Sequence, residues 1–349
     1  MFGHIIFRRL LGGVAALVGA IIAVRIDIPL PWLLGPLFTI AALRLLSAPV
    51  ATYKPLRNVG QWVIGLSLGL YFSPEIVRLV ANHWVVLLIG TGLSLLLATG
   101  GTWLLYRVGK VDIKTAWFAS AIGGASEMSI LAEKHGARVD LVASAHSLRV
   151  LAVVTIIPFG FEAIGFLGSD DSLITDVPFS FTNALFISAA SVLVGAWFFR
   201  MGIASAWILG PLAAAGFLTL SGLVPTSMPG WFINIGQLFL GWAIGDRYRP
   251  AFFKAAPRFL TAVALYSVSA IALVALVGWV VSVNSDVGLA TLWLGMAPGG
   301  LAEMSITAKV LMLGVPMVTA LQVCRMAFVV ITAGWIYEKY IQPKFDSQG

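Results

Sequence analysis

Two short segments of the chain carry the residues best suited to chemistry. Residues 123–130 read Gly-Gly-Ala-Ser-Glu-Met-Ser-Ile and residues 299–306 read Gly-Gly-Leu-Ala-Glu-Met-Ser-Ile, so Glu303 follows Glu127 by 176 positions. Both glutamates lie within long apolar stretches. A carboxylate deep in a bilayer costs at least about 2.5 kcal/mol, so it usually faces a cavity or a partner. The glutamates therefore suggest cation coordination or proton carriage, with an ion pair to an arginine as the alternative.

The glycines before each glutamate predict a break in a helix. A broken helix presents unpaired N–H groups where its second piece begins, which suits an anion, and free carbonyl groups, which suit Na⁺ or a proton. The alternative is that the glycines only let two helices pack closely. The candidate binding residues of both segments are Gly123, Gly124, Ser126, Glu127, Ser129, Gly299, Gly300, Glu303 and Ser305.

Two arginines in apolar stretches are further candidates. Arg149 and Arg325 are also 176 positions apart, and each follows a polar residue, His146 or Gln322, by three positions. Residues three apart share one face of a helix. A guanidinium binds a carboxylate through two N–H groups, so the arginines suggest an organic anion as substrate, or else ion pairs with the two glutamates. His146 suggests a proton relay, but Gln322 cannot titrate, which argues against a symmetric relay.

Repeated glycines and a tryptophan motif mark other helices. The segments 60–69 and 236–245 carry several glycines beside Gln61 and Gln237 respectively. Such a glycine face usually serves close helix packing, and the two amides are candidates for lining a path. The motif Trp-x-x-Gly-Pro at 32–36 and 207–211 predicts a kink in a membrane span.

The composition places these residues in a membrane. Of 349 residues, 59% are hydrophobic and only 11% charged, and the mean hydropathy is +0.96, whereas soluble domains carry about 25% charged residues. The net charge of +7 comes from Lys and Arg in short loops between apolar runs, where they orient spans, so we expect no nucleic-acid partner. One cysteine and four scattered histidines predict neither a metal site nor a cofactor.

Residues that match each other 176 positions apart predict an internal duplication. Besides the motifs above, Pro74 matches Pro250 and Trp117 matches Trp293, each 176 positions on. We therefore predict a first repeat at residues 1–165, an external acidic linker at 166–180 and a second repeat at 181–349. Ala297-Pro-Gly-Gly has a proline where Ala121-Ile-Gly-Gly has none, so the two motifs need not bind the same group.

Each repeat contains six apolar stretches, and the fifth is ambiguous. The fifth stretches, 115–134 and 288–313, contain the glycine–glutamate motifs and are either spans or re-entrant hairpins. If all stretches span, nine Lys and Arg of the loops and termini fall on each side; if the fifth stretches are hairpins, sixteen fall inside and two, Arg25 and Arg78, outside. The positive-inside rule favours the hairpins. Five spans per repeat then invert the second copy and leave both termini in the cytoplasm.

These motifs resemble the AbrB family of duplicated bacterial membrane proteins, which also carries an ammonia monooxygenase label. The resemblance covers essentially the whole chain and implies an inner-membrane protein with a regulatory or transport role. More distantly, two hairpins in inverted halves are similar to the sodium-coupled glutamate and citrate symporters, a likeness of fold alone.

The expected protein is therefore an all-α polytopic membrane protein of two inverted repeats, each of about five transmembrane helices and one re-entrant or broken hairpin. The function that we expect is secondary transport of a small, anionic solute coupled to Na⁺ or H⁺, without an enzymatic activity. A membrane-embedded regulator of gene expression without transport is the alternative, and a membrane oxidoreductase is a third. Its partners are the lipid bilayer and the solute; a homo-oligomer is compatible with the sequence.

Overall fold

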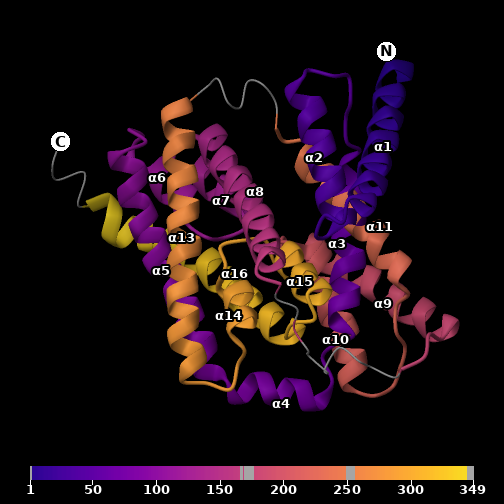
Figure 1. Ribbon diagram of the computed structural model, residues 1–349. Helices are drawn as coiled ribbons and strands as arrows, with labels where there is room; N and C mark the ends of the chain where they lie inside the picture. Colours follow the sequence, from indigo (N-terminus) through magenta and orange to yellow (C-terminus); the bar gives the residue numbers. More distant parts are fainter. Residues whose placement is uncertain (1, 166–167, 169–176, 249–255, 344–349) are drawn as a thin grey trace. The chain divides into compact units, whose positions relative to one another are not determined.

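The computed structural model describes residues 2–165, 168, 177–248 and 256–343, and within these residues every regular element is a helix (Figure 1). This confirms the predicted all-α fold. Six helices are long and apolar enough to cross a membrane, as expected of a polytopic membrane protein. They are α1 (Phe2–Arg25), α5 (Trp84–Arg107), α8 (Val139–Ala163), α9 (Phe181–Arg200), α13 (Pro257–Val283) and α16 (Val315–Ile336), which continues as a π-helix at Tyr337–Ile341.

Several predicted spans are shorter than a membrane requires. Helices α2 (Pro31–Leu45) and α10 (Ala206–Leu220) have 15 residues each, and at 1.5 Å per residue each covers about 22 Å. The hydrocarbon core is about 30 Å thick. Helix α3 (Lys54–Gly69) is followed by α4 (Pro74–Asn82) at a bend of 89°. The count of five spans per repeat and the inversion of the copies therefore stay predictions.

The chain forms two compact units, and each unit takes helices from both halves of the sequence. Unit 1 contains residues 1–79, 158–252 and 309–316, and unit 2 contains residues 80–157, 253–308 and 317–349. The predicted repeats thus do not coincide with the compact units. The predicted linker 166–180 lies largely outside the described residues.

In unit 1 the helices of one half pack on those of the other. Helix α2 contacts α1 and α11 (Gly230–Gly245), while α10 contacts α9 and α3, and α3 contacts α11. Glycines allow these close approaches. A Cβ added at Gly65 of α3 would overlap the carbonyl of Ile208, and one at Gly241 of α11 would overlap that of Leu33. The glycine faces thus serve helix packing in unit 1.

The Trp-x-x-Gly-Pro motifs also bring helices together. Gly35 of α2 lies against the backbone of Gly19 in α1, and Gly210 of α10 lies against Gly195 in α9, with no room for a side chain at either motif glycine. The prolines that follow lie inside their helices. The motif therefore combines a proline with a close helix contact, one in each half of the chain.

Among the described residues, unit 2 contains the long helices α5 and α13, most of α8 and α16, and four short helices. Helices α5 and α13 lie side by side (Figure 1) and share an apolar core with residues of α14 and α16. The short helices are α6 (Ile113–Ser120), α7 (Ala125–Lys134), α14 (Leu289–Met296) and α15 (Leu301–Val310). Helices α6 and α7 occupy the predicted fifth stretch of the first repeat, and α14 and α15 occupy that of the second repeat.

The first pair folds back on itself. Helices α6 and α7 contact each other, and the backbone N–H of Arg138, just after α7, donates to Oγ1 of Thr115 at the start of α6, at 3.0 Å. The Thr115 hydroxyl in turn donates to the carboxylate of Asp112. The chain thus returns to the place where α6 began, as a re-entrant hairpin requires.

Candidate functional site

Both glycine–glutamate motifs form breaks between short helices. Helix α6 ends at Ser120 and α7 begins at Ala125, while α14 ends at Met296 and α15 begins at Leu301. The backbone between them is extended: φ and ψ are −57° and 126° at Ala121 and −58° and 141° at Ala297. The sequence correctly predicted two helix breaks at these positions.

The glycines are required by space rather than by backbone conformation. Gly124 has a φ of −66°, which any residue can adopt. A Cβ at Gly124 would overlap Oε2 of Glu127, and a Cβ at Gly300 would overlap Oε2 of Glu303. Each glutamate is the third residue of its helix, so its carboxylate folds back over the residue that precedes the helix.

This placement has an electrostatic consequence. The start of a helix carries a partial positive charge that stabilises an anion. A glutamate at the third helical position can reach back to the start of its own helix, and Glu127 and Glu303 both do so. The anion-binding position that the sequence suggested at the start of α7 and α15 is therefore occupied by the protein's own carboxylates.

The free carbonyl groups at the end of α6 are held by buried side chains. His146 Nε2 lies 3.0 Å from the carbonyl oxygen of Phe118, the hydroxyl of Tyr266 donates to the carbonyl of Ser120 at 2.9 Å, and Arg149 Nη1 donates to that of Ala121 at 3.5 Å. A helix end leaves carbonyls without partners, and in an apolar environment each must be satisfied. These three side chains stabilise the first break because they satisfy its carbonyl groups.

The end of α14 is held in the same way. Gln322 Nε2 donates to the carbonyls of Leu294 at 2.8 Å, Gly295 at 3.2 Å and Ala297 at 3.2 Å. Arg325 Nη1 donates to the carbonyl of Ala297, and its Nη2 donates to that of Gly299 at 2.9 Å. The two breaks are thus stabilised by corresponding residues, 176 positions apart.

His146 and Gln322 have the same hydrogen-bonding role. Arg149 Nη2 lies 3.1 Å from Nδ1 of His146, and Arg325 Nη2 lies 2.6 Å from Oε1 of Gln322. A guanidinium can only donate, so Nδ1 accepts and Nε2 carries the hydrogen that binds Phe118. This pattern assigns a neutral imidazole to His146, with one donor and one acceptor, like an amide.

Both arginines converge on the second break. Arg149 Nε donates to the carbonyl of Pro298 at 3.0 Å, between the two carbonyls that Arg325 holds. The arginines are only 2% and 4% exposed. Within the described residues, no salt bridge joins either of them to Glu127 or Glu303, so the ion pairs considered from the sequence do not form. In the part of the chain that the structure describes, Arg325 Nε is buried without a hydrogen-bond partner.

The serines differ in their surroundings. The Ser129 hydroxyl donates to the carbonyl of Ala125 in its own helix at 2.7 Å, and Ser305 is buried and accepts from the hydroxyl of Thr319 at 3.0 Å. Ser126 is exposed. Of the three, Ser126 has the hydroxyl that is most accessible to a solute.

The structure groups most, but not all, of the predicted site residues. The glycines, glutamates, serines, arginines, His146 and Gln322 all belong to unit 2, whereas Gln61 and Gln237 belong to unit 1. The sequence analysis missed Tyr266 and Thr319. The signal for Tyr266 was available, because it is a hydrogen-bonding side chain within the long apolar stretch of α13.

Comparisons with known proteins give one family and two relatives that match most of the chain. The model of a family described as transition state regulatory protein AbrB matches residues 32–340. A Bacillus subtilis (strain 168) protein named "Uncharacterized protein YhjN" is 27% identical over 341 residues, covering 89% of this chain and 88% of the relative. An Escherichia coli (strain K12) protein named "Putative regulator AbrB" is 24% identical over 313 residues, covering 88% of this chain and 89% of the relative.

Proposed function

The chain belongs to the AbrB family, and on that premise we propose that it is a secondary transporter of a small organic anion, coupled to Na⁺ or H⁺. The observation that carries this proposal is the convergence of Arg149 and Arg325 on the carbonyls of residues 297–299. Both guanidinium groups are buried, and neither has a carboxylate partner among the described residues.

Two buried positive charges held only by neutral groups favour the binding of an anion. A buried charge is costly unless an opposite charge compensates it, and carbonyl groups do not supply one. The unpartnered Nε of Arg325 adds a donor. An organic carboxylate would provide both the negative charge and the acceptor oxygens that guanidinium groups bind best.

The carboxylates of Glu127 and Glu303 are suited to the coupling ion. Each is partly buried at the start of its helix, close to extended backbone of the kind that coordinates Na⁺ in transporters. Na⁺ or a proton bound to a carboxylate would cancel its charge and weaken its repulsion of an arriving anion. Binding of the cation and of the anionic solute would then be favourable together, which is the physical basis of symport.

Binding of organic anions to the purified full-length protein tests this proposal. We would screen mono- and dicarboxylates by thermal shift, with and without Na⁺ and at two pH values. A carboxylate that stabilises the wild type should not stabilise Arg325→Gln. The matched control is Arg258→Gln, because Arg258 also donates to a carbonyl, that of Val108 at 2.8 Å, but is exposed. Equal stabilisation of the wild type and Arg325→Gln would refute the proposed site.

The proposal also includes the membrane in which the protein lies and the orientation of the chain in that membrane. The family and the distribution of Lys and Arg support the bacterial inner membrane with both termini in the cytoplasm. We do not propose gene regulation, although the names of the family and of one relative contain the word regulator, because none of the contacts described above favours it.

A further inference from the structure

A cavity in unit 1 has a chemistry of its own. Its volume is about 410 Å³, and its wall comes from the end of α3, the segment that follows it, the end of α10, the segment after α10 and Lys309. Cavities of about 300–1,000 Å³ are typical of small-molecule sites. The proposed transport function uses none of the residues that line this cavity.

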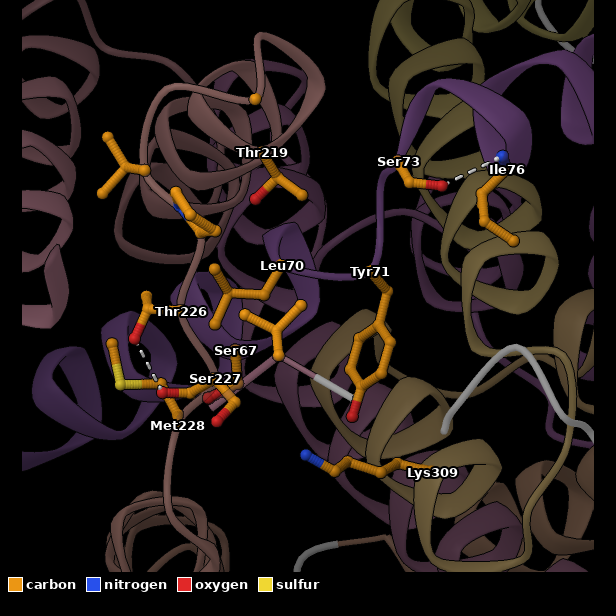
Figure 2. Close-up of a pocket in the computed structure, with 14 residues that line it drawn as sticks. Ser67, Leu70, Tyr71, Ser73, Ile76, Thr219, Thr226, Ser227, Met228 and Lys309 are labelled. Carbon is orange, nitrogen blue, oxygen red and sulfur yellow. Dashed lines mark hydrogen bonds between the residues drawn. The ribbon is translucent and has the colours of Figure 1, made fainter. Parts of the chain in front are cut away.

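Among the described residues of the wall, Lys309 is the only cationic one. Its Nζ lies 5.2 Å from the centre of the Tyr71 ring, and in Figure 2 the lysine passes beside that ring toward the side of the cavity where Ser67 and Ser227 lie. Within the described residues Lys309 forms no salt bridge. The aromatic ring attracts the ammonium group but does not compensate its charge.

The hydroxyl groups of the wall differ in what they can still donate. The Ser67 hydroxyl donates to the carbonyl of Val63 at 2.8 Å, that of Ser73 to the Glu75 carboxylate at 2.8 Å, and that of Thr226 to main-chain carbonyls. Their hydrogens are therefore already in use.

Three other hydroxyl groups keep their hydrogens for an occupant, because those of Tyr71, Thr219 and Ser227 donate to none of the described residues. Among these residues Thr219 Oγ1 is buried without a hydrogen-bond partner, and a buried hydroxyl in that state costs roughly as much as a lost hydrogen bond. The Tyr71 hydroxyl points to the same space as Lys309 (Figure 2). Three hydroxyl donors and one ammonium group thus line a cavity whose remaining wall includes apolar residues such as Leu70 and Met228.

We propose that this cavity is a second anion site, which binds a singly charged oxyanion, a carboxylate or phosphate group, between Lys309 and the Tyr71 hydroxyl. The ammonium group excludes a cation, and the unused donors call for acceptor oxygens. A free organic acid and the headgroup of an anionic lipid share this chemistry. The site goes beyond the proposed transport function, because it belongs to unit 1 and involves neither arginine.

Amine labelling of Lys309 tests the proposal locally. The full-length protein in nanodiscs of phosphatidylcholine would be acetylated with an amine-reactive ester, and the rate at each lysine would be read by peptide mass spectrometry. Butyrate at about ten times its Kd leaves about one site in eleven empty, so it should slow the labelling of Lys309 about tenfold. Butyramide, a neutral molecule of similar shape, should not.

Lys339 is the matched control. Its Nζ also lies over an aromatic ring, 4.9 Å from the centre of Trp335, but Lys339 is exposed and should be labelled equally with and without butyrate. Nanodiscs containing phosphatidylglycerol distinguish the source: slow labelling of Lys309 there without butyrate would support the same oxyanion site with a lipid as its occupant. Equal protection by butyramide, equal slowing at Lys339, or no change in any of these conditions would overturn the proposal.

A variant of Tyr71 defines the role of its hydroxyl. Tyr71→Phe keeps the ring beside Lys309 and should raise the butyrate concentration for half-protection about tenfold, because a hydrogen bond to a charged group is lost. Arg325→Gln should leave the protection of Lys309 unchanged, so this experiment distinguishes failure of this site from failure of the transport site. Protection that is insensitive to Tyr71→Phe would contradict the assigned contacts.

Discussion

Arg149 Nε lies 3.0 Å from the carbonyl oxygen of Pro298, so the last helix of the first half of the chain holds the helix break of the second half. Arg325 holds the residues on both sides of Pro298. Because guanidinium groups are donors only, a break whose carbonyls they occupy is rigid and positively charged. The carbonyls satisfy the hydrogen bonds of the two buried arginines but do not cancel their charges, and within the described residues no carboxylate pairs with either.

The equivalence of His146 and Gln322 gives the first prediction. Each accepts from an arginine and donates to main-chain carbonyls, one for His146 and three for Gln322, so His146→Gln should leave the apparent Tm and the pH dependence of function nearly unchanged. His146→Leu removes both bonds and should destabilise the protein by about 1–3 kcal/mol. Thermal unfolding of the purified variants measures this. If His146→Gln shifts the pH profile instead, His146 carries protons and our assignment is wrong.

The glycines before the glutamates give the second prediction. Gly124→Ala and Gly300→Ala each place a Cβ on a carboxylate oxygen, so the glutamate must leave the start of its helix. We expect a destabilisation of about 1–3 kcal/mol together with loss of cation-dependent anion binding, measured by thermal shift.

Gly92→Ala provides the control for that experiment. Gly92 lies in α5, and a Cβ there meets nothing within 4 Å, so this variant should keep the stability and the binding of the wild type. If all three alanine variants bind the anion like the wild type, the position of the carboxylates does not matter.

The positions of the two helix breaks could be predicted from the sequence, but the residues that contact the breaks could not. Glycine pairs within apolar stretches, repeated after 176 positions, predicted both breaks because few other residues interrupt a helix in this way. The partners of Arg149 could not be predicted. Its strongest contacts are with the main chain of distant residues such as Pro298, and a carbonyl is present at every position of a sequence.

The reason for the glycines could not be predicted from the sequence either. Gly124 has an ordinary φ and is required because the Glu127 side chain folds over it. Helix length was a second difficulty: the apolar stretch 30–47 became a helix of only 15 residues, α2, with left-handed residues, Leu30 and Ser47, near its two ends.

The third prediction concerns the side of the membrane on which the first hairpin begins and ends. Since Arg138 returns to Thr115, the end of α5 and the end of α7 should face the same side of the membrane. In a background lacking Cys324, the single cysteine of the chain, cysteines at Arg107 and Lys134 should react with a membrane-impermeant maleimide from the cytoplasmic side. A cysteine at Arg78 should react from the opposite side. Labelling of positions 107 and 134 from different sides would rule out the hairpin.

The central claim is that anion transport depends on the carboxylates at the two breaks, and uptake into proteoliposomes tests it most directly. An organic anion identified in the screen would be offered to the wild type, Glu127→Gln, Glu303→Gln and, as a control, Glu133→Gln, which alters an exposed carboxylate of α7. We predict that the wild type and Glu133→Gln accumulate the anion only when an inward Na⁺ or proton gradient is applied. Glu127→Gln and Glu303→Gln should lose this gradient-driven uptake. Accumulation at the wild-type rate by both of these variants would contradict the account.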